Sequence, residues 1–417
     1  MPWGGFYRPM SGLFYLAVFS LFGLNPAPYH VATWLVLLAS AYLMYRMARL
    51  LGGGELAAGL AALVACYHVG LSNLNYNTAF VPDVLCYFFY LGSFVYYARI
   101  RKRGRLLGTG ETLAFLGLYL CALDSKEMAV TLPVVLLVYE WIYHRPERPD
   151  GRGILEWLRG PGKAALFGSV LNLLYIYGLA FGPDRMMSSP AYHPVFALQR
   201  VKWFQQAYLG DLLLGWSSGW VGMLALWAAL AYLAWRRDRP VLRFCWMFMV
   251  LTPLPIEFLE GRSGACLAIP MAGWAIFGAV VLGDLVDVLA GVLSREPILR
   301  RLGRKGLAAA LAGAAVLLWA RENRRRSPDF VMAALGRPTW EVIEQFRAVN
   351  PSVRPGSRVA FLDDPLQSWD MLFVAELWFR DRSLAIHVAR AGPLSPDELE
   401  KMDCVFTFED GKLIRLR

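Results

Sequence analysis

Apolar segments long enough to cross a membrane recur through the first three quarters of the chain. Residues 9–24 are apolar too, but a helix lying along the membrane surface fits them as well as a span does. The pattern predicts a mainly α-helical, polytopic membrane protein. We expect about ten spans, over residues 29–48, 55–72, 82–98, 111–124, 128–143, 164–182, 218–235, 243–257, 264–290 and 306–320.

The pattern changes after residue 320, where shorter apolar segments alternate with polar ones. These segments predict strands at 357–362, 384–389, 404–408 and 412–416, and helices at 369–379 and 395–402. Ser395, followed three residues later by Glu398, is typical of a helix start. We therefore expect a transmembrane domain over 1–320, with a periplasmic or interfacial segment at 1–28, and a small α/β domain over 321–417. This domain is periplasmic if 306–320 is a span and cytoplasmic if it is not.

Composition agrees with a membrane protein, because 57% of the 417 residues are hydrophobic and the mean hydropathy is +0.41. The formal charge of +10 would also suit a nucleic-acid partner. The lysines and arginines lie in alternate connections, however, with clusters at 99–105, 145–163, 236–243 and 295–305. By the positive-inside rule these loops face the cytoplasm. We expect a bacterial inner-membrane protein whose Lys126 and Arg262 face the periplasm, with lipid and no nucleic acid around it.

The cysteines and the N-terminal residues give little information about function. Five of the six cysteines lie in or beside spans, so neither a disulfide framework nor a CxxC metal site is expected. The start of the chain lacks the pattern of a cleavable signal peptide. The sequence predicts no metal site, although it does not decide whether a divalent metal takes part in the reaction.

Polar residues collect at the ends of the spans that face the periplasm. Charged side chains in hydrocarbon cost roughly 2.5 to 3.5 kcal/mol each, so a run such as Asp124 to Glu127 indicates a wet, functional site. Cations there would offset charge on a phosphate leaving group, and a carboxylate would take a proton from an acceptor hydroxyl. The candidates for substrate binding are Lys126, Arg262, Arg8, His30, His68 and Asp124, and those for catalysis are Glu127 and Asp83.

Each candidate also has a purely structural interpretation. Lys126 and Glu127 would form an ion pair that closes a tight turn, and Asp83 after Pro82 would cap a helix start. Arg262 would extend to the membrane surface, and single histidines are more often packed than bound to substrate.

One stretch resembles a known family. Residues 125–133, Ser-Lys-Glu-Met-Ala-Val-Thr-Leu-Pro, followed by Tyr139-Glu140-Trp141, are similar to the "SKE-x-x-VTLP…YDW" signature of GT-C membrane glycosyltransferases related to protein O-mannosyltransferases. Residues 6–10 and 22–30 resemble that family's "YRPL…FGLNP-x-x-YH". The resemblance implies transfer of a mannose-like hexose, with inversion, from a polyprenyl-phosphate donor to a hydroxyl of a protein or glycan, with Lys126 near the donor phosphate.

The chain also departs from the family pattern. Asn73 stands where the family has a glutamate, and Phe80-Val81-Pro82-Asp83 lacks the family's arginine. The family's acidic catalytic residue precedes the "YRPL" segment, and only six residues precede Tyr7 here. We therefore expect the acid to lie upstream of Met1, in a span and loop that this chain lacks.

One other function stays open and a second is disfavoured. A truncated or non-catalytic membrane scaffold of the same fold would explain the missing acid. A transporter or flippase would need charges at the bilayer midplane and broken helices in two matching halves, and the sequence shows neither.

Overall fold

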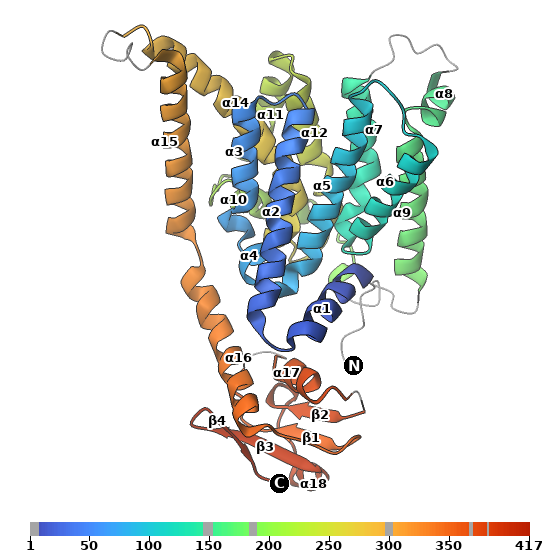
Figure 1. Ribbon diagram of the computed structural model, residues 1–417, viewed down its shortest axis with the longest axis vertical. Helices are drawn as coiled ribbons and strands as arrows, with labels where there is room; N and C mark the ends of the chain where they lie inside the picture. The colour runs from blue at the N-terminus through green and yellow to red at the C-terminus, as the bar shows by residue number, and fades with distance from the viewer. Residues whose placement is uncertain (1–7, 145–152, 183–189, 297–302, 367–369, 382) are drawn as a thin grey trace. The chain divides into compact units, whose positions relative to one another are not determined.

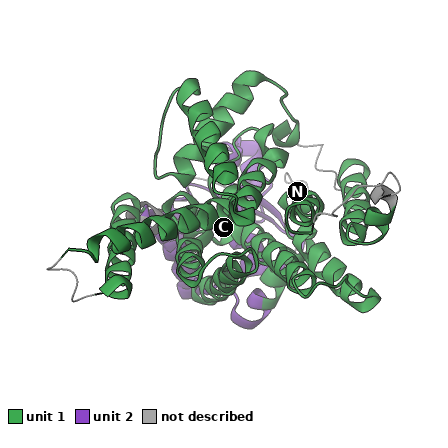
Figure 2. Cartoon of the chain, turned by 90° about the horizontal axis from the view of Figure 1, so that it is seen from above, with its two compact units in different colours: residues 1–17, 27–327 green, residues 18–26, 328–417 purple. Residues whose placement is uncertain are grey.

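The computed structural model describes residues 8–144, 153–182, 190–296, 303–366, 370–381 and 383–417. The chain forms two compact units, residues 1–17 with 27–327 and residues 18–26 with 328–417 (Figure 2). Each unit is described by itself. Tyr7, which belongs to the resemblance, lies outside the described residues.

The first unit is helical, and Figure 1 shows its helices as long, neighbouring rods. Short 3-10 turns separate several of them. Its longer helices are α1 (Pro9–Phe22, shared with the second unit), α2 (Pro26–Leu50), α3 (Glu55–Cys66), α5 (Val81–Arg101), α6 (Thr109–Leu123), α7 (Leu132–Tyr143), α8 (Gly153–Arg159), α9 (Lys163–Phe181), α10 (Leu198–Leu212), α11 (Trp220–Arg236), α12 (Pro240–Leu251), α14 (Ala268–Leu293) and α15 (Gly303–Arg326). The short elements are η1 (Val69–Leu71), α4 (Asn73–Tyr76), η2 (Thr78–Phe80), η3 (Glu127–Thr131), η5 (Pro190–Tyr192), α13 (Leu254–Glu257) and η6 (Gly264–Leu267).

Five helical stretches of the described chain are long and apolar enough to cross a membrane. They are Pro26–Leu50, Thr78–Arg101, Lys163–Phe181, Pro240–Glu257 and Gly264–Leu293. Each of the ten predicted spans coincides with a helix, but several of these helices are shorter than a span requires. The class of a polytopic helical membrane protein is therefore confirmed, whereas the number of spans stays a prediction.

One predicted boundary was wrong. The segment expected to span residues 55–72 is helical only to Cys66, because the chain then turns through η1, α4 and η2. The predicted span 306–320 lies within α15, which continues to Arg326; there Arg326 forms an ion pair with Glu322 one turn earlier and Asn323 is buried.

Helix α14 lies at the centre of the first unit, where it packs against α3, α5, α12 and α15. Buried aromatic side chains fill the space between α5, α7 and α12. The ring of Phe94 lies 5.5 Å from that of Tyr139 and 5.4 Å from that of Phe244. Such pairs add stability beyond the apolar area that they bury.

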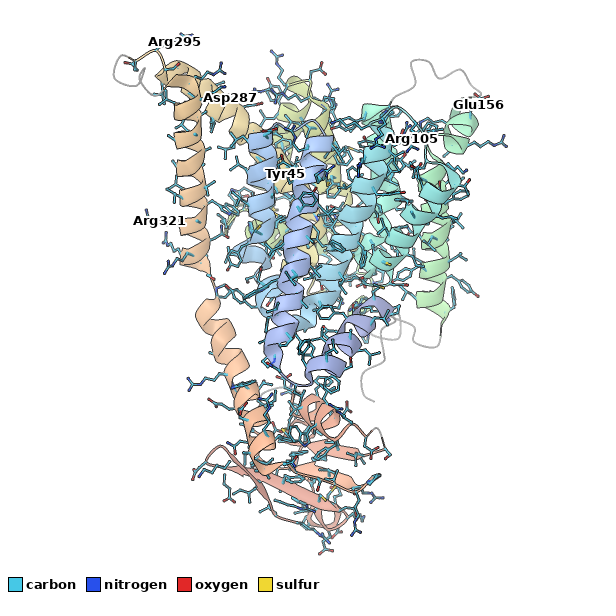
Figure 3. The ribbon with its side chains drawn as sticks, in the orientation of Figure 1. Tyr45, Arg105, Glu156, Asp287, Arg295 and Arg321 are labelled. Carbon is cyan, nitrogen blue, oxygen red and sulfur yellow. The ribbon has the colours of Figure 1, made fainter. Side chains whose placement is uncertain are left out.

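The two ends of this helical unit differ, because the clusters of lysine and arginine at 99–105 and 236–243 lie at one of them. Figure 3 shows Arg105, Glu156, Asp287 and Arg295 at one end, which we call the basic end, where α5 joins α6 and α14 finishes. The opposite end, which we call the Lys126 end, contains the connection from α6 to η3 and the turns of residues 67–80.

The second unit contains a four-stranded sheet in the order β2-β1-β3-β4. Strand β1 (Arg358–Phe361) is parallel to β2 (Ala385–Val388) and to β3 (Cys404–Glu409), and β4 (Lys412–Arg415) is antiparallel to β3. Its helices are α16 (Asp329–Val349), α17 (Asp370–Phe379) and α18 (Pro396–Glu400).

The predicted strands coincide with β1 to β4, and the predicted helices with α17 and α18. Ser395 and Glu398 form the expected reciprocal cap of α18. Helix α16, by contrast, was not predicted. Its residues Val342, Ile343 and Phe346 are buried in the core of this unit, and Pro338 inside it breaks the usual sequence pattern of a helix.

Candidate functional site

Lys126 forms a buried ion pair with Asp83. Its Nζ lies 2.6 Å from Asp83 Oδ1, and the two side chains are 10% and 4% exposed. Lys126 precedes η3 in an extended conformation, and Asp83 lies in the first turn of α5, directly after Pro82. Burial alone would lower the pKa of Lys126, but the charge and hydrogen bond of Asp83 raise it above its usual range, so Lys126 stays charged.

Glu127 pairs with Arg8 beside this lysine. Arg8 Nη2 donates to Glu127 Oε2 at 3.0 Å and to the hydroxyl of Tyr192 at 3.1 Å. Burial would lower the pKa of Arg8, but the charges of Glu127 and Tyr192 outweigh it and the net shift is upward. Two ion pairs thus lie on consecutive residues of one turn.

Arg262 joins the same group through Tyr192. Its guanidinium lies over the Tyr192 ring, 4.6 Å from the ring centre. In the described part of the chain, Arg262 forms no ion pair with a carboxylate. Tyr192 therefore connects two arginines, one with a carboxylate partner and one whose donors are available for an anion.

Arg200 is a second cation of this kind. Its guanidinium lies 4.5 Å from the ring centre of Trp203, and its Nε and Nη2 are buried with no hydrogen-bond partner among the described residues. Burial lowers the pKa of Arg200; the nearby charge of Glu260 opposes this shift, and that of Arg262 adds to it. Buried donors without acceptors are costly, so an anion at this position would stabilise them.

Several residues of this group were missed by the sequence reasoning. Cys266 Sγ lies 3.6 Å from Lys126 Nζ, and Tyr175 of α9 interacts electrostatically with Glu127 and Arg8. The Tyr175 hydroxyl is buried without a partner in the described chain. Tyr192 and Tyr175 carry no sequence signal, because isolated tyrosines near a membrane surface are common.

Asp124, one of the predicted binding residues, ends helix α6. Its carbonyl accepts a hydrogen bond from the backbone of Met10 at 3.3 Å, and burial raises the pKa of its carboxyl. This contact holds the start of α1 close to the Lys126 turn.

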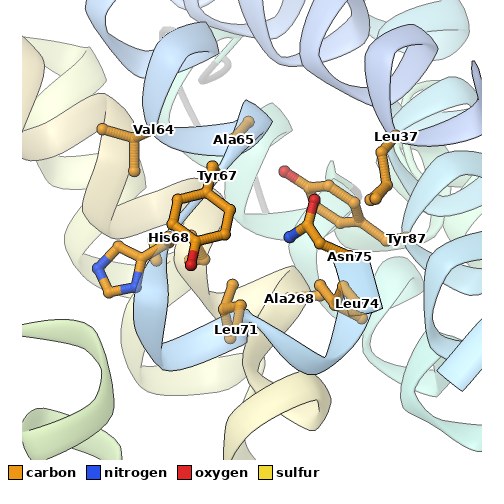
Figure 4. A pocket seen from close by; sticks show the side chains of 11 residues that line it. Leu37, Val64, Ala65, Tyr67, His68, Leu71, Leu74, Asn75, Tyr87 and Ala268 are labelled. Atoms are coloured by element: carbon orange, nitrogen blue, oxygen red, sulfur yellow. The ribbon is translucent and has the colours of Figure 1, made fainter. Parts of the chain in front are cut away.

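His68 and His30 have other surroundings. His68 Nδ1 accepts from Gly70 N at 3.1 Å, so Nε2 carries the proton and donates to Leu212 O at 3.2 Å. Its ring borders a small pocket, as Figure 4 shows. His30 lies near Trp34, with the ring centres 6.5 Å apart. None of these contacts involves Lys126 or its partners.

The signature residue Glu140 lies toward the basic end of α7. It is 1% exposed and accepts two hydrogen bonds from Arg101, at 2.7 and 2.9 Å, and one from Tyr97 at 2.7 Å. Both of its carboxylate oxygens are held by Arg101, which indicates a structural role for this part of the signature.

The described residues contain no group of three or more His, Cys, Asp or Glu side chains that could hold a metal ion.

Comparisons with known proteins show the fold. No protein-family model matches the chain, and no curated protein matches it. The apo crystal structure of ArnT from Cupriavidus metallidurans is 14% identical with a TM-score of 0.56, and the match covers 97% of this chain and 83% of that one. ArnT bound to undecaprenyl phosphate is 14% identical with a TM-score of 0.55, covering 98% and 87%. The chain therefore has the fold of ArnT.

Proposed function

We propose that this protein is a membrane glycosyltransferase of the GT-C class that takes a sugar from a polyprenyl-phosphate donor. The observation that carries the proposal is the cluster around Lys126, which gathers Arg8, Arg262 and Arg200 at one end of a helical membrane unit. An ArnT-like fold supports it, because ArnT is of this class and one of its structures holds undecaprenyl phosphate. Fold alone does not define chemistry, so the cluster is the stronger argument.

The cations suit a phosphate leaving group. When the bond between the sugar carbon and the phosphate oxygen breaks, negative charge grows on that oxygen, and fixed cations in a site with little water offset it. The acceptor hydroxyl forms the new bond on the opposite face of the sugar and loses a proton to a carboxylate. We propose a mannose-like hexose as the sugar and a protein or glycan hydroxyl as the acceptor, on the periplasmic side of a bacterial inner membrane.

Asp83 and Glu127 then serve chiefly to position the cations. Each is held by a cation, Asp83 by Lys126 and Glu127 by Arg8. A carboxylate oxygen that already accepts from a cation is less available to an acceptor hydroxyl. This pairing also favours a second candidate function, a non-catalytic scaffold that binds the lipid without transferring its sugar.

The C-terminal residues 328–417 belong on the same side of the membrane in this proposal. Helix α15 ends at the Lys126 end, where Ser327 and Tyr67 share a hydrogen bond of 2.8 Å between their hydroxyls. The chain therefore leaves the helical unit there.

Binding of undecaprenyl phosphate to the purified full-length protein tests the donor class, with undecaprenol as the matched control. We expect the phosphate form to bind at least about tenfold more tightly, since charge-assisted hydrogen bonds contribute about 1.5–3 kcal/mol. Equal binding of the two lipids would contradict the proposal. Transfer of radiolabelled hexose from the lipid to an acceptor separates the enzyme from the scaffold.

A further inference from the structure

Helices α6 and α9 enclose an apolar groove that the proposed reaction does not use. The groove has a volume of about 490 Å³, within the range of about 300 to 1,000 Å³ that is usual for ligand sites. Figure 1 shows the two helices side by side in the helical unit. The groove is lined from α6 by Thr109, Thr112, Leu113, Leu116, Gly117 and Leu120 and from α9 by Lys163, Phe167, Val170, Leu171 and Leu174.

The groove has one polar mouth, at the basic end. Thr109 and Lys163 are the first residues of their helices, and the lining residues beyond the first turn of each helix are apolar. Lys163 forms no ion pair with any carboxylate in the described chain, and its Nζ lies 5.7 Å from the ring centre of Phe167. Lys163 is therefore a cation with no ion-pair partner among the described residues, at the polar mouth of an otherwise apolar groove.

The groove is about as long as the hydrocarbon layer of one membrane leaflet is thick. From Thr109 to Leu120 the helix rises about 16 Å, at about 1.5 Å per residue, and the hydrocarbon core of a bilayer is about 30 Å thick. An acyl chain that enters at the basic end would fill the groove and stop near the middle of the membrane.

Gly117 gives the groove its depth. A side chain added there would meet no other atom within 4 Å, and the groove wall at this point is the α6 backbone. Leu113 and Leu174, each 65% exposed, form parts of the two rims.

We propose that this groove binds one anionic phospholipid of the leaflet at the basic end, with its phosphate at Lys163 and one acyl chain between α6 and α9. Charge complementarity selects this occupant. The polyprenyl donor carries its phosphate at the Lys126 end, so that lipid would present only its uncharged tail to this groove. Phosphatidylcholine has no net negative charge for Lys163 to offset.

Native mass spectrometry of the full-length protein in micelles containing phosphatidylglycerol and phosphatidylcholine tests the proposal. We expect one retained phosphatidylglycerol, and retention about fivefold lower in Lys163→Gln, the factor that one cation near a membrane surface contributes. Lys305→Gln removes an exposed lysine outside the groove and should leave retention unchanged.

A second pair of variants tests the channel itself. Gly117→Leu fills the groove from α6 and should also lower retention, whereas Gly178→Leu, in α9 but outside the groove lining and likewise with no atom within 4 Å, should not. Equal retention of the two phospholipids, or retention unchanged in both Lys163→Gln and Gly117→Leu, would overturn the proposal. Displacement of the bound lipid by undecaprenol would show that the occupant is a polyprenyl chain and would overturn it as well.

Discussion

Lys126 Nζ lies 2.6 Å from Asp83 Oδ1, although the two residues are 43 positions apart and both are buried. A buried ion pair is weak evidence for stability, because the cost of removing two charges from water cancels much of their attraction. Its presence at one end of a membrane unit is better explained by function. Asp83 keeps Lys126 charged and fixed in place until a phosphate arrives.

Removal of Asp83 should therefore have two opposite effects. Asp83→Asn leaves a buried lysine without a counter-charge, and the empty protein should lose about 3–5 kcal/mol of stability. Added undecaprenyl phosphate replaces the missing charge, so it should raise the melting temperature of this variant more than that of the wild type. Thermal unfolding with and without the lipid measures both. Asp284→Asn, which breaks exposed pairs with Arg237 and Arg239, is the control and should cost less than about 1 kcal/mol.

The Arg101–Glu140 pair should matter for stability alone. Glu140→Gln leaves Arg101 partly unpaired in a buried position and should cost about 3–5 kcal/mol. Binding of undecaprenyl phosphate should stay within about twofold of the wild type, because Glu140 lies toward the basic end. Glu111→Gln, which breaks the exposed pair with Arg105, is the matched control. A Glu140 variant with normal stability and weak lipid binding would show that we have misplaced its role.

His68 should make the protein less stable in acid. Burial lowers the pKa of His68 to about 4, while the hydrogen bond to Leu212 O opposes this, and its ordinary value is 6.5. Below pH 6.5 the unfolded chain takes up a proton that the folded His68 refuses until about pH 4. The contribution is complete above pH 6.5 and declines by about 3 kcal/mol as the pH falls to 4. In His68→Gln, the slope of melting temperature against pH between 6.5 and 4 should be shallower. An unchanged slope would mean that His68 titrates normally.

Tyr192 should contribute to lipid binding through two separable contacts. Tyr192→Phe removes the hydroxyl that accepts from Arg8 and should weaken undecaprenyl phosphate binding about fivefold. Tyr192→Ala also removes the ring under Arg262 and should weaken it about tenfold or more. Tyr232→Phe alters an exposed tyrosine and should change nothing. Equal affinities of the Phe and Ala variants would rule out a role for the ring.

Much of the fold could be predicted from the sequence because burial in a membrane leaves a strong pattern. Every predicted span coincides with a helix, and the capping residues Ser395 and Glu398 correctly placed α18. The shortened α3 could not be predicted, since residues 67–72 are apolar enough to continue a helix. Helix α16 was missed because Pro338 and scattered charges obscure its buried face.

The candidate site could be predicted only in part. Charges at span ends identified Lys126, Glu127, Asp83 and Arg8, which the structure brings into two ion pairs. The partners within each pair could not be read from the sequence, because each pair joins segments that are distant along the chain. For His68 the residue type suggested substrate binding, but both ring nitrogens form hydrogen bonds with the backbone instead.

The most direct test of the account is the affinity for undecaprenyl phosphate of a variant that lacks the whole central pair, Asp83→Asn with Lys126→Met. Both charges are removed together, so no buried charge is left unpaired and the protein should fold. We predict binding at least about tenfold weaker than in the wild type, with undecaprenol binding unchanged, while Lys102→Met at the basic end binds normally. Wild-type affinity in a folded double variant would contradict the central claim that Lys126 binds the donor phosphate.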